Sequence, residues 1–129
     1  MLFETKGIVM RRLRMMFSAL LVGVFGIGLA GCATTPSVTV SSSTVIIDVR
    51  TPEEYAAGHL ENAVNINWEG EFTSVIGELP KDGEYLLYCR SGNRAGQAKA
   101  FMDSSGYTNV TNLGSVQDAA SATGLSVVQ

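Results

Sequence analysis

From Thr44 onward, the hydrophobic pattern alternates between runs typical of buried strands and runs with helical spacing. Thr44–Val49 and Glu84–Cys89 are almost continuously apolar or β-branched, as expected for strands buried on both faces of a parallel sheet. Further strands are predicted at Ala63–Asn67 and Tyr107–Leu113. Because these short strands alternate with helical segments, the pattern predicts an α/β fold: a small central parallel sheet flanked by helices on both faces.

Four helices are predicted between and after these strands. The first has Thr51 as its N-cap and Pro52 at its first helical position, and it ends at Gly58. The other three are predicted over Glu69–Leu79, Arg94–Ser105 and Val116–Ala122.

The N-terminal segment has the pattern of an export signal. Three arginines, Arg11, Arg12 and Arg14, precede the uncharged run Met15–Ala30. That run is shorter than the roughly 20 residues that a membrane-spanning helix needs. The sequence that follows, Leu29-Ala30-Gly31-Cys32, resembles the bacterial lipobox. This resemblance implies that residues 1–31 are cleaved and that Cys32 is lipidated, so that the protein is exported and anchored to the cell membrane. The alternative is an uncleaved anchor with an incidental cysteine.

A short tether is predicted between the lipid and the folded domain. Residues 32–43 include the run Thr34–Ser43, which is rich in Ser and Thr and has no charge. We expect the domain to occupy 44–129, or to begin near residue 38 if Val38–Val40 forms an edge strand.

Charge and composition argue against nucleic-acid binding and against a metal site. The chain has 129 residues and a formal net charge of −3, but from Cys32 onward there are five basic and eleven acidic side chains. That acidity opposes binding to nucleic acid. With one histidine and two separated cysteines, we expect no metal site.

The candidate chemistry is concentrated at one strand-to-helix junction. Cys89 ends a predicted strand, and Arg90-Ser91-Gly92-Asn93-Arg94 leads directly into a helix. Ligands of open α/β sheets bind beyond the carboxyl ends of the strands. Gly92 permits a tight loop, whose amides and following helix N-terminus would surround the sulfur together with two arginines. This environment favours a reactive thiolate over an inert buried thiol.

Here the sequence resembles the rhodanese family of sulfurtransferases, in particular its small single-domain members. Three stretches of the chain match the family. The first is Asp48-Val49-Arg50 with Glu53, Tyr55, Gly58-His59-Leu60, Ala63 and Asn65-Ile66, and the second is Cys89-Arg90-Ser91-Gly92-Asn93-Arg94-Ala95. The third and weaker match is Gly106-Tyr107 with Leu113-Gly114. The family's C-terminal tryptophan is replaced by Ala119, which is expected to loosen the last helix or widen the site.

The resemblance implies a persulfide mechanism with Cys89 as the nucleophile. A thiosulfate-like anion would donate its outer sulfur, and cyanide or a thiol would then accept it in a ping-pong reaction. Arg90 and Arg94 would attract the donor, and Arg94 would also brace the loop. No cofactor is needed, and we expect a monomer. The main alternative is a non-catalytic sulfane-sulfur carrier or binding module of the cell envelope.

The length of the loop distinguishes this chain from another class of cysteine enzymes. Cysteine phosphatases place five residues between the cysteine and the arginine, whereas four lie between Cys89 and Arg94, which disfavours that activity.

Asp48 and Arg50 are expected either to position the loop or to form a structural ion pair, with Glu53 or Glu54 as other partners. For His59 a structural hydrogen bond is favoured over a role as general base. Trp68 and Phe72 are assigned to core packing.

Overall fold

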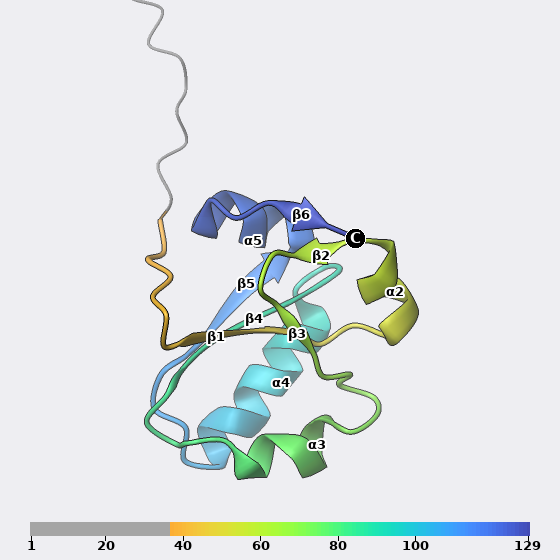
Figure 1. The fold of residues 1–129 in the computed structure, drawn as a ribbon. Helices are drawn as coiled ribbons and strands as arrows, with labels where there is room; N and C mark the ends of the chain where they lie inside the picture. The colour runs from red at the N-terminus through yellow and green to blue at the C-terminus, as the bar shows by residue number, and fades with distance from the viewer. Residues whose placement is uncertain (1–36) are drawn as a thin grey trace, which may run out of the picture. The chain divides into compact units, whose positions relative to one another are not determined.

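The computed structural model describes residues 37–129, which form a four-stranded parallel sheet beside a small antiparallel pair (Figure 1). In the parallel sheet the strand order is β3-β1-β4-β5. The bounds are Thr44–Asp48 for β1, Val64–Asn65 for β3, Glu84–Cys89 for β4 and Val110–Ser115 for β5. The antiparallel pair joins β2 (His59–Leu60) to β6 (Val127–Val128).

The connecting segments are short helices. They are α2 (Pro52–Ala57), α3 (Phe72–Val75), the 3-10 turn η1 (Ile76–Glu78), α4 (Asn93–Ser104) and α5 (Val116–Thr123). Within residues 37–129, no helix is both long enough and apolar enough to cross a membrane.

Two hydrophobic clusters cover the two faces of the parallel sheet. Alternate residues of β4 divide between them: Leu87 and Cys89 pack with α3 and α4, whereas Leu86 and Tyr88 pack with α5. Figure 1 shows α3 and α4 together on one side of the sheet. The predicted α/β fold, with helices on both faces of a central parallel sheet, is therefore confirmed.

Helix α2 begins at the residue that the sequence predicts. The Thr51 hydroxyl accepts a hydrogen bond from the Glu54 amide at 3.3 Å, and the Glu54 carboxylate accepts one from the Thr51 amide at 3.1 Å. This reciprocal arrangement is a capping box, with Pro52 at the first helical position. The predicted N-cap and helix start are confirmed.

Two elements begin three residues later than predicted, because turns occupy the first predicted residues. The helix predicted from Glu69 begins at Phe72, since the Asn67 carbonyl accepts hydrogen bonds from the Gly70 and Phe72 amides in a preceding turn. The strand predicted from Tyr107 begins at Val110. Tyr107 instead closes α4 through its amide, which donates to the Met102 carbonyl at 3.1 Å, and its ring is buried.

One further expectation, at the N-terminal end of the domain, needs correction. Val38–Val40 is not a strand; the Val38 amide donates to the Ala122 carbonyl at 2.9 Å, and both valines pack on the cluster beneath α5. Ala119, in α5, is completely buried in that cluster, and its expected effect on the last helix or on the width of the site stays a prediction. The boundary predictions for 1–31, 32–43 and 44–129 stay predictions, and Cys32 lies outside the described residues.

Candidate active site

Cys89 lies at the carboxyl end of β4, in a loop that leads directly into α4. Its side chain is completely buried, and the Gly92 amide donates a hydrogen bond to Sγ at 2.9 Å. Gly92 is the N-cap of α4 and has a φ of 88°, a left-handed conformation that glycine adopts without strain. The loop therefore curls back so that its own backbone donates to the cysteine sulfur.

The end of β5 supports the back of this loop. The Asn112 side-chain amide donates to the Gly92 carbonyl at 3.0 Å, and its oxygen accepts from the Gly114 amide at 2.9 Å. The backbones are close together: a Cβ on Gly92 would lie 3.2 Å from the Gly114 Cα. The loop conformation is thus determined partly by a neighbouring strand.

Arg94 connects the loop to α2 through Glu54. Its two terminal nitrogens donate to the two carboxylate oxygens of Glu54 at 2.8 and 3.0 Å. Hydrogen bonding to Arg94 lowers the pKa of Glu54 to about 2, and the same hydrogen bonds raise the pKa of Arg94. This ion pair joins the helix after the loop to α2, and the role of Arg94 in bracing the loop stays a prediction.

Asp48 and Arg50 form a buried ion pair at the end of β1. Arg50 Nη2 donates to Asp48 Oδ2 at 2.7 Å, and Arg50 Nε approaches both carboxylate oxygens at 3.0 and 3.1 Å. The same Nη2 donates to the Gly58 carbonyl at 2.6 Å. Burial alone would lower the pKa of Arg50, but the hydrogen bonds and charge of Asp48 raise it. Of the two alternatives for these residues, the structural ion pair is present, formed with each other rather than with Glu53 or Glu54.

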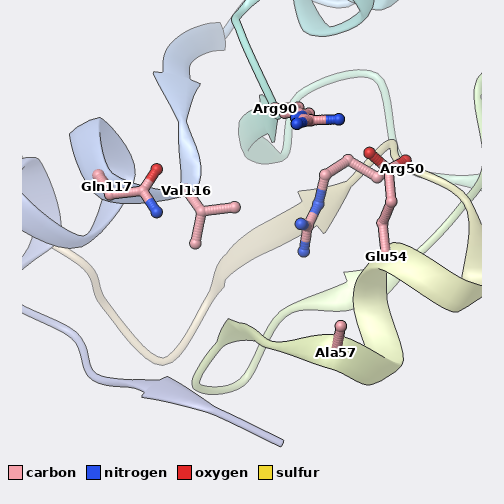
Figure 2. Close-up of a pocket in the computed structure, with 6 residues that line it drawn as sticks. All are labelled: Arg50, Glu54, Ala57, Arg90, Val116 and Gln117. Carbon is pink, nitrogen blue, oxygen red and sulfur yellow. The ribbon is translucent and has the colours of Figure 1, made fainter.

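A cavity of about 380 Å³ lies between α2, the cysteine loop and the start of α5 (Figure 2). It is lined by Arg50, Glu54, Ala57, Arg90, Val116 and Gln117. Figure 2 shows Val116 and Gln117 on one side of this space, with Arg50 and Glu54 on the other. Arg90, the residue directly after Cys89, is exposed and forms part of the cavity wall.

The remaining candidates have simpler environments. Ser91 and Asn93 are exposed on the loop, and the Asn93 side-chain oxygen accepts from Gln97 at 3.3 Å. His59 Nδ1 is 2.9 Å from the Tyr55 carbonyl, and its ring stacks on Tyr55, so its structural assignment is confirmed. The aromatic side chains of Trp68, Phe72 and Phe101 pack edge-to-face in the cluster beneath α4, as predicted for the first two.

Three residues that shape this site were not predicted from the sequence: Glu54 and Asn112, which contact the loop and its helix, and Gln117, which lines the cavity. From the sequence, Glu54 was considered as a partner of Asp48 or Arg50 and not of Arg94, and Asn112 was assigned only to a strand. No local signal identifies their partners, because each contact joins segments far apart in the chain.

Comparisons with known proteins agree on one family. The profile of the Rhodanese-like domain family matches residues 38–120. The thiosulfate sulfurtransferase PspE of Escherichia coli (strain K12) is 35% identical over 98 residues, which are 75% of this chain and 94% of that protein. A sulfurtransferase of Allochromatium vinosum is 38% identical over 69 residues, covering 54% of this chain and 64% of that protein. A solved rhodanese with anions from E. coli is similar in structure, with a TM-score of 0.55 and 30% identity over 67% of this chain and 98% of that one.

Proposed function

The chain belongs to the rhodanese-like domain family, and from this premise we propose that it is a sulfurtransferase acting through a persulfide on Cys89. The observation that carries the proposal is the hydrogen bond from the Gly92 amide to Cys89 Sγ at 2.9 Å, at the carboxyl end of a parallel strand. An N–H group aimed at the sulfur stabilises negative charge there, both on the thiolate and on the persulfide that follows.

The proposed reaction has two half-reactions. The Cys89 thiolate attacks the outer sulfur of a thiosulfate-like donor; the S–S bond of the donor breaks, and sulfite leaves with the bonding electron pair. Cys89 then carries a persulfide anion. An acceptor such as cyanide attacks the terminal sulfur, thiocyanate is released, and the Cys89 thiolate is regenerated. The sulfur atom is transferred from donor to acceptor without an external oxidant or reductant, as expected for covalent ping-pong catalysis.

Arg90 is the cation proposed to attract the donor. Arg94 donates to Glu54 through both terminal nitrogens, so its charge is already balanced by a carboxylate. Arg90 is exposed beside Cys89 and, within residues 37–129, forms no ion pair. A planar guanidinium suits a dianionic donor with several oxygens.

The test is thiocyanate formation from thiosulfate and cyanide by the full chain, solubilised in detergent. Cys89→Ser should abolish turnover, because a serine hydroxyl cannot form the persulfide. Cys32→Ser is the matched control, since it changes the other cysteine and should keep full turnover. Thiosulfate alone should add one sulfur atom to the mass of the wild-type chain and none to that of Cys89→Ser. Turnover by Cys89→Ser would overturn the proposed role of Cys89.

A second candidate is a non-catalytic sulfane-sulfur carrier or binding module. The buried thiol favours it, since a completely buried sulfur exchanges slowly with small donors. A carrier would take up one sulfur atom and release it to a partner without repeated turnover of thiosulfate and cyanide. Many turnovers per Cys89 would therefore support the enzyme over the carrier.

Export and lipid anchoring through Cys32 are also part of the proposal, supported by the basic segment, apolar run and lipobox-like sequence that end at that residue. Two acyl chains on one diacylglyceryl group are sufficient for stable attachment to a membrane. Cys32→Ser should leave the chain unprocessed or release it from membranes. Unchanged mass and unchanged membrane partitioning in that variant would contradict lipidation.

A further inference from the structure

Strand β5 is irregular where it runs beside the cysteine. Strands β4 and β5 pair in parallel with Leu87 opposite Asn112 and Cys89 opposite Ser115, so β5 has one residue more than β4 between these two pairs. Gly114 lies within this bulge and has a φ of 89°. Bulges redirect side chains and are common next to active sites. The bulge therefore indicates that a side chain at this point of β5 serves the cysteine loop.

Asn112 connects the bulge to the loop through both atoms of its side-chain amide. Its oxygen accepts a hydrogen bond from the Gly114 amide at 2.9 Å, and its nitrogen donates one to the Gly92 carbonyl at 3.0 Å. Apart from Cys89 itself, no other side chain in the described part of the chain hydrogen-bonds to the backbone of Arg90–Gly92. The side chain of Asn112 is thus the direct link between β5 and the loop backbone.

Gly92 needs such outside contacts to keep its conformation. Glycine adopts positive and negative φ with similar ease, so its own sterics do not fix the φ of 88°. Its carbonyl accepts from the Gly96 amide, within α4, at 2.9 Å and from Asn112, outside the helix. Holding this carbonyl restricts rotation of the Gly92 backbone, and so it restricts the direction of the Gly92 amide.

The direction of that amide matters because Cys89 is completely buried. Among residues 37–129, the Gly92 amide is the only hydrogen-bond donor to Sγ. A buried anion without a donor is costly, and a charge-assisted hydrogen bond weakens when it is misaligned. A misdirected amide would leave both the attacking thiolate and the persulfide without this stabilisation.

We propose that Asn112 is a positioning residue for sulfur transfer: by holding the Gly92 carbonyl, its side-chain amide keeps the Gly92 N–H directed at Cys89 Sγ. This inference rests on the proposed function. Asn112 contacts neither the donor nor the acceptor in this role. Its effect therefore lies in the rate of persulfide formation and not in donor binding, which is assigned to Arg90.

Two substitutions separate the two hydrogen bonds of Asn112. At neutral pH, Asn112→Asp keeps an oxygen that accepts from the Gly114 amide but cannot donate to the Gly92 carbonyl. Asn112→Ala loses both hydrogen bonds and adds no charge. Asn109→Asp is the matched control, because Asn109 is exposed, lies directly before β5, and has no side-chain hydrogen bond within residues 37–129.

The first test measures hydrogen exchange at the Gly92 amide by nuclear magnetic resonance, in the full chain solubilised in detergent. Exchange should be about tenfold faster in both Asn112 variants than in wild type, because the amide is no longer held in one direction. The amide of Leu87, within β4, should keep its wild-type rate, and Asn109→Asp should change neither rate. Unchanged exchange at Gly92, or equal acceleration at Gly92 and Leu87, would overturn the positioning role.

The second test measures formation of the Cys89 persulfide in a single turnover at increasing thiosulfate concentrations. Both Asn112 variants should lower the maximal rate about tenfold, and Asn112→Ala should keep the half-saturating concentration within about twofold of wild type. Asn109→Asp should keep both values. An unchanged maximal rate in both Asn112 variants, or an effect confined to the half-saturating concentration, contradicts the proposal.

The two tests also separate this inference from the proposed function. If the wild-type chain forms no persulfide from thiosulfate, the proposed function is wrong. The exchange measurement uses the unmodified chain and needs no sulfur donor, so it still decides whether Asn112 positions the Gly92 amide.

Discussion

The carboxylate of Glu54 receives both terminal nitrogens of Arg94, at 2.8 and 3.0 Å, across 40 positions of sequence. Arg94 lies in the first turn of α4, immediately after the cysteine loop, and Glu54 lies in the first turn of α2. Glu54 also accepts the Thr51 amide in the capping box. One carboxylate therefore holds the start of α2 and positions the helix that supports Cys89.

Removing the charge of Glu54 should weaken both stability and sulfur transfer. Glu54→Gln keeps the shape of the side chain but removes the charge that balances Arg94. We expect unfolding free energy to fall by about 1–2 kcal/mol, since the pair is bidentate but partly exposed to solvent. We expect kcat/KM for thiosulfate to fall about tenfold. Urea unfolding and thiocyanate kinetics measure the two effects.

Glu53→Gln is the matched control for that substitution. Glu53 is the neighbouring acid in the same first helical turn, it is exposed, and it has no ion pair within residues 37–129. It should change kcat/KM less than twofold. Equal loss of activity in the two variants would contradict a specific role for the contact between Glu54 and Arg94.

The same ion pair predicts a dependence of stability on pH. The folded-state pKa of Glu54, about 2, lies below its ordinary value of 4.5. The pair therefore contributes its full stabilisation above pH 4.5 and loses it as the pH falls toward 2. The difference in unfolding free energy between wild type and Glu54→Gln should be largest near pH 6 and should shrink steadily below pH 4.5. A difference that stays constant down to pH 2.5 would contradict the lowered pKa.

Arginine and lysine should not be equivalent at position 94. Arg94→Lys keeps the positive charge but loses the planar fork that reaches both oxygens of Glu54. We expect Arg94→Lys to lose about three- to tenfold in kcat/KM, and Arg94→Ala about ten- to a hundredfold. Thiocyanate kinetics for the two variants give the comparison, and wild-type activity in Arg94→Lys would show that charge alone is sufficient.

The buried pair of Asp48 and Arg50 should be costly to break. Asp48 is completely buried and Arg50 is 7% exposed, so Asp48→Asn would leave a buried guanidinium without its counter-charge. We expect a loss of about 3–5 kcal/mol in unfolding free energy. Asp82→Asn removes an exposed acid that forms no ion pair in the described part of the chain, and should change stability by less than about 0.5 kcal/mol. Equal stability of the two variants in urea would show that Arg50 does not depend on Asp48.

The conformation of the cysteine loop should depend on glycine at position 92. Gly92→Ala places a Cβ 3.2 Å from the Gly114 Cα at a φ of 88°, so the backbone is strained and either the loop or Gly114 must shift. We expect this shift to weaken the hydrogen bond from the amide of residue 92 to Cys89. We expect at least a tenfold loss of kcat/KM and a loss of about 1–2 kcal/mol in stability. Gly77→Ala is the control, because a Cβ there meets nothing within 4 Å, and it should keep full activity. Wild-type kinetics in Gly92→Ala would contradict this account of the loop.

Local sequence patterns determined most of the elements around the site. The continuous apolar run predicted β4 with the bounds Glu84–Cys89, and Thr51 with Pro52 predicted the start of α2. Gly92 identified the turn after Cys89, as its left-handed backbone shows. These predictions succeed because strand periodicity, helix capping and glycine conformation each depend on residues that are adjacent in the chain.

Only the tertiary structure decided what holds and surrounds the loop. Glu54 reaches Arg94, Asn112 reaches Gly92, and Gln117 from α5 lines the same cavity as Arg90. The pairing of β2 with β6 likewise joins His59–Leu60 to Val127–Val128 near the C-terminus. Each of these contacts depends on how helices and strands pack around the sheet. Packing brings together side chains that are far apart in the chain, and the residues adjacent to each of them in the sequence do not indicate its partner.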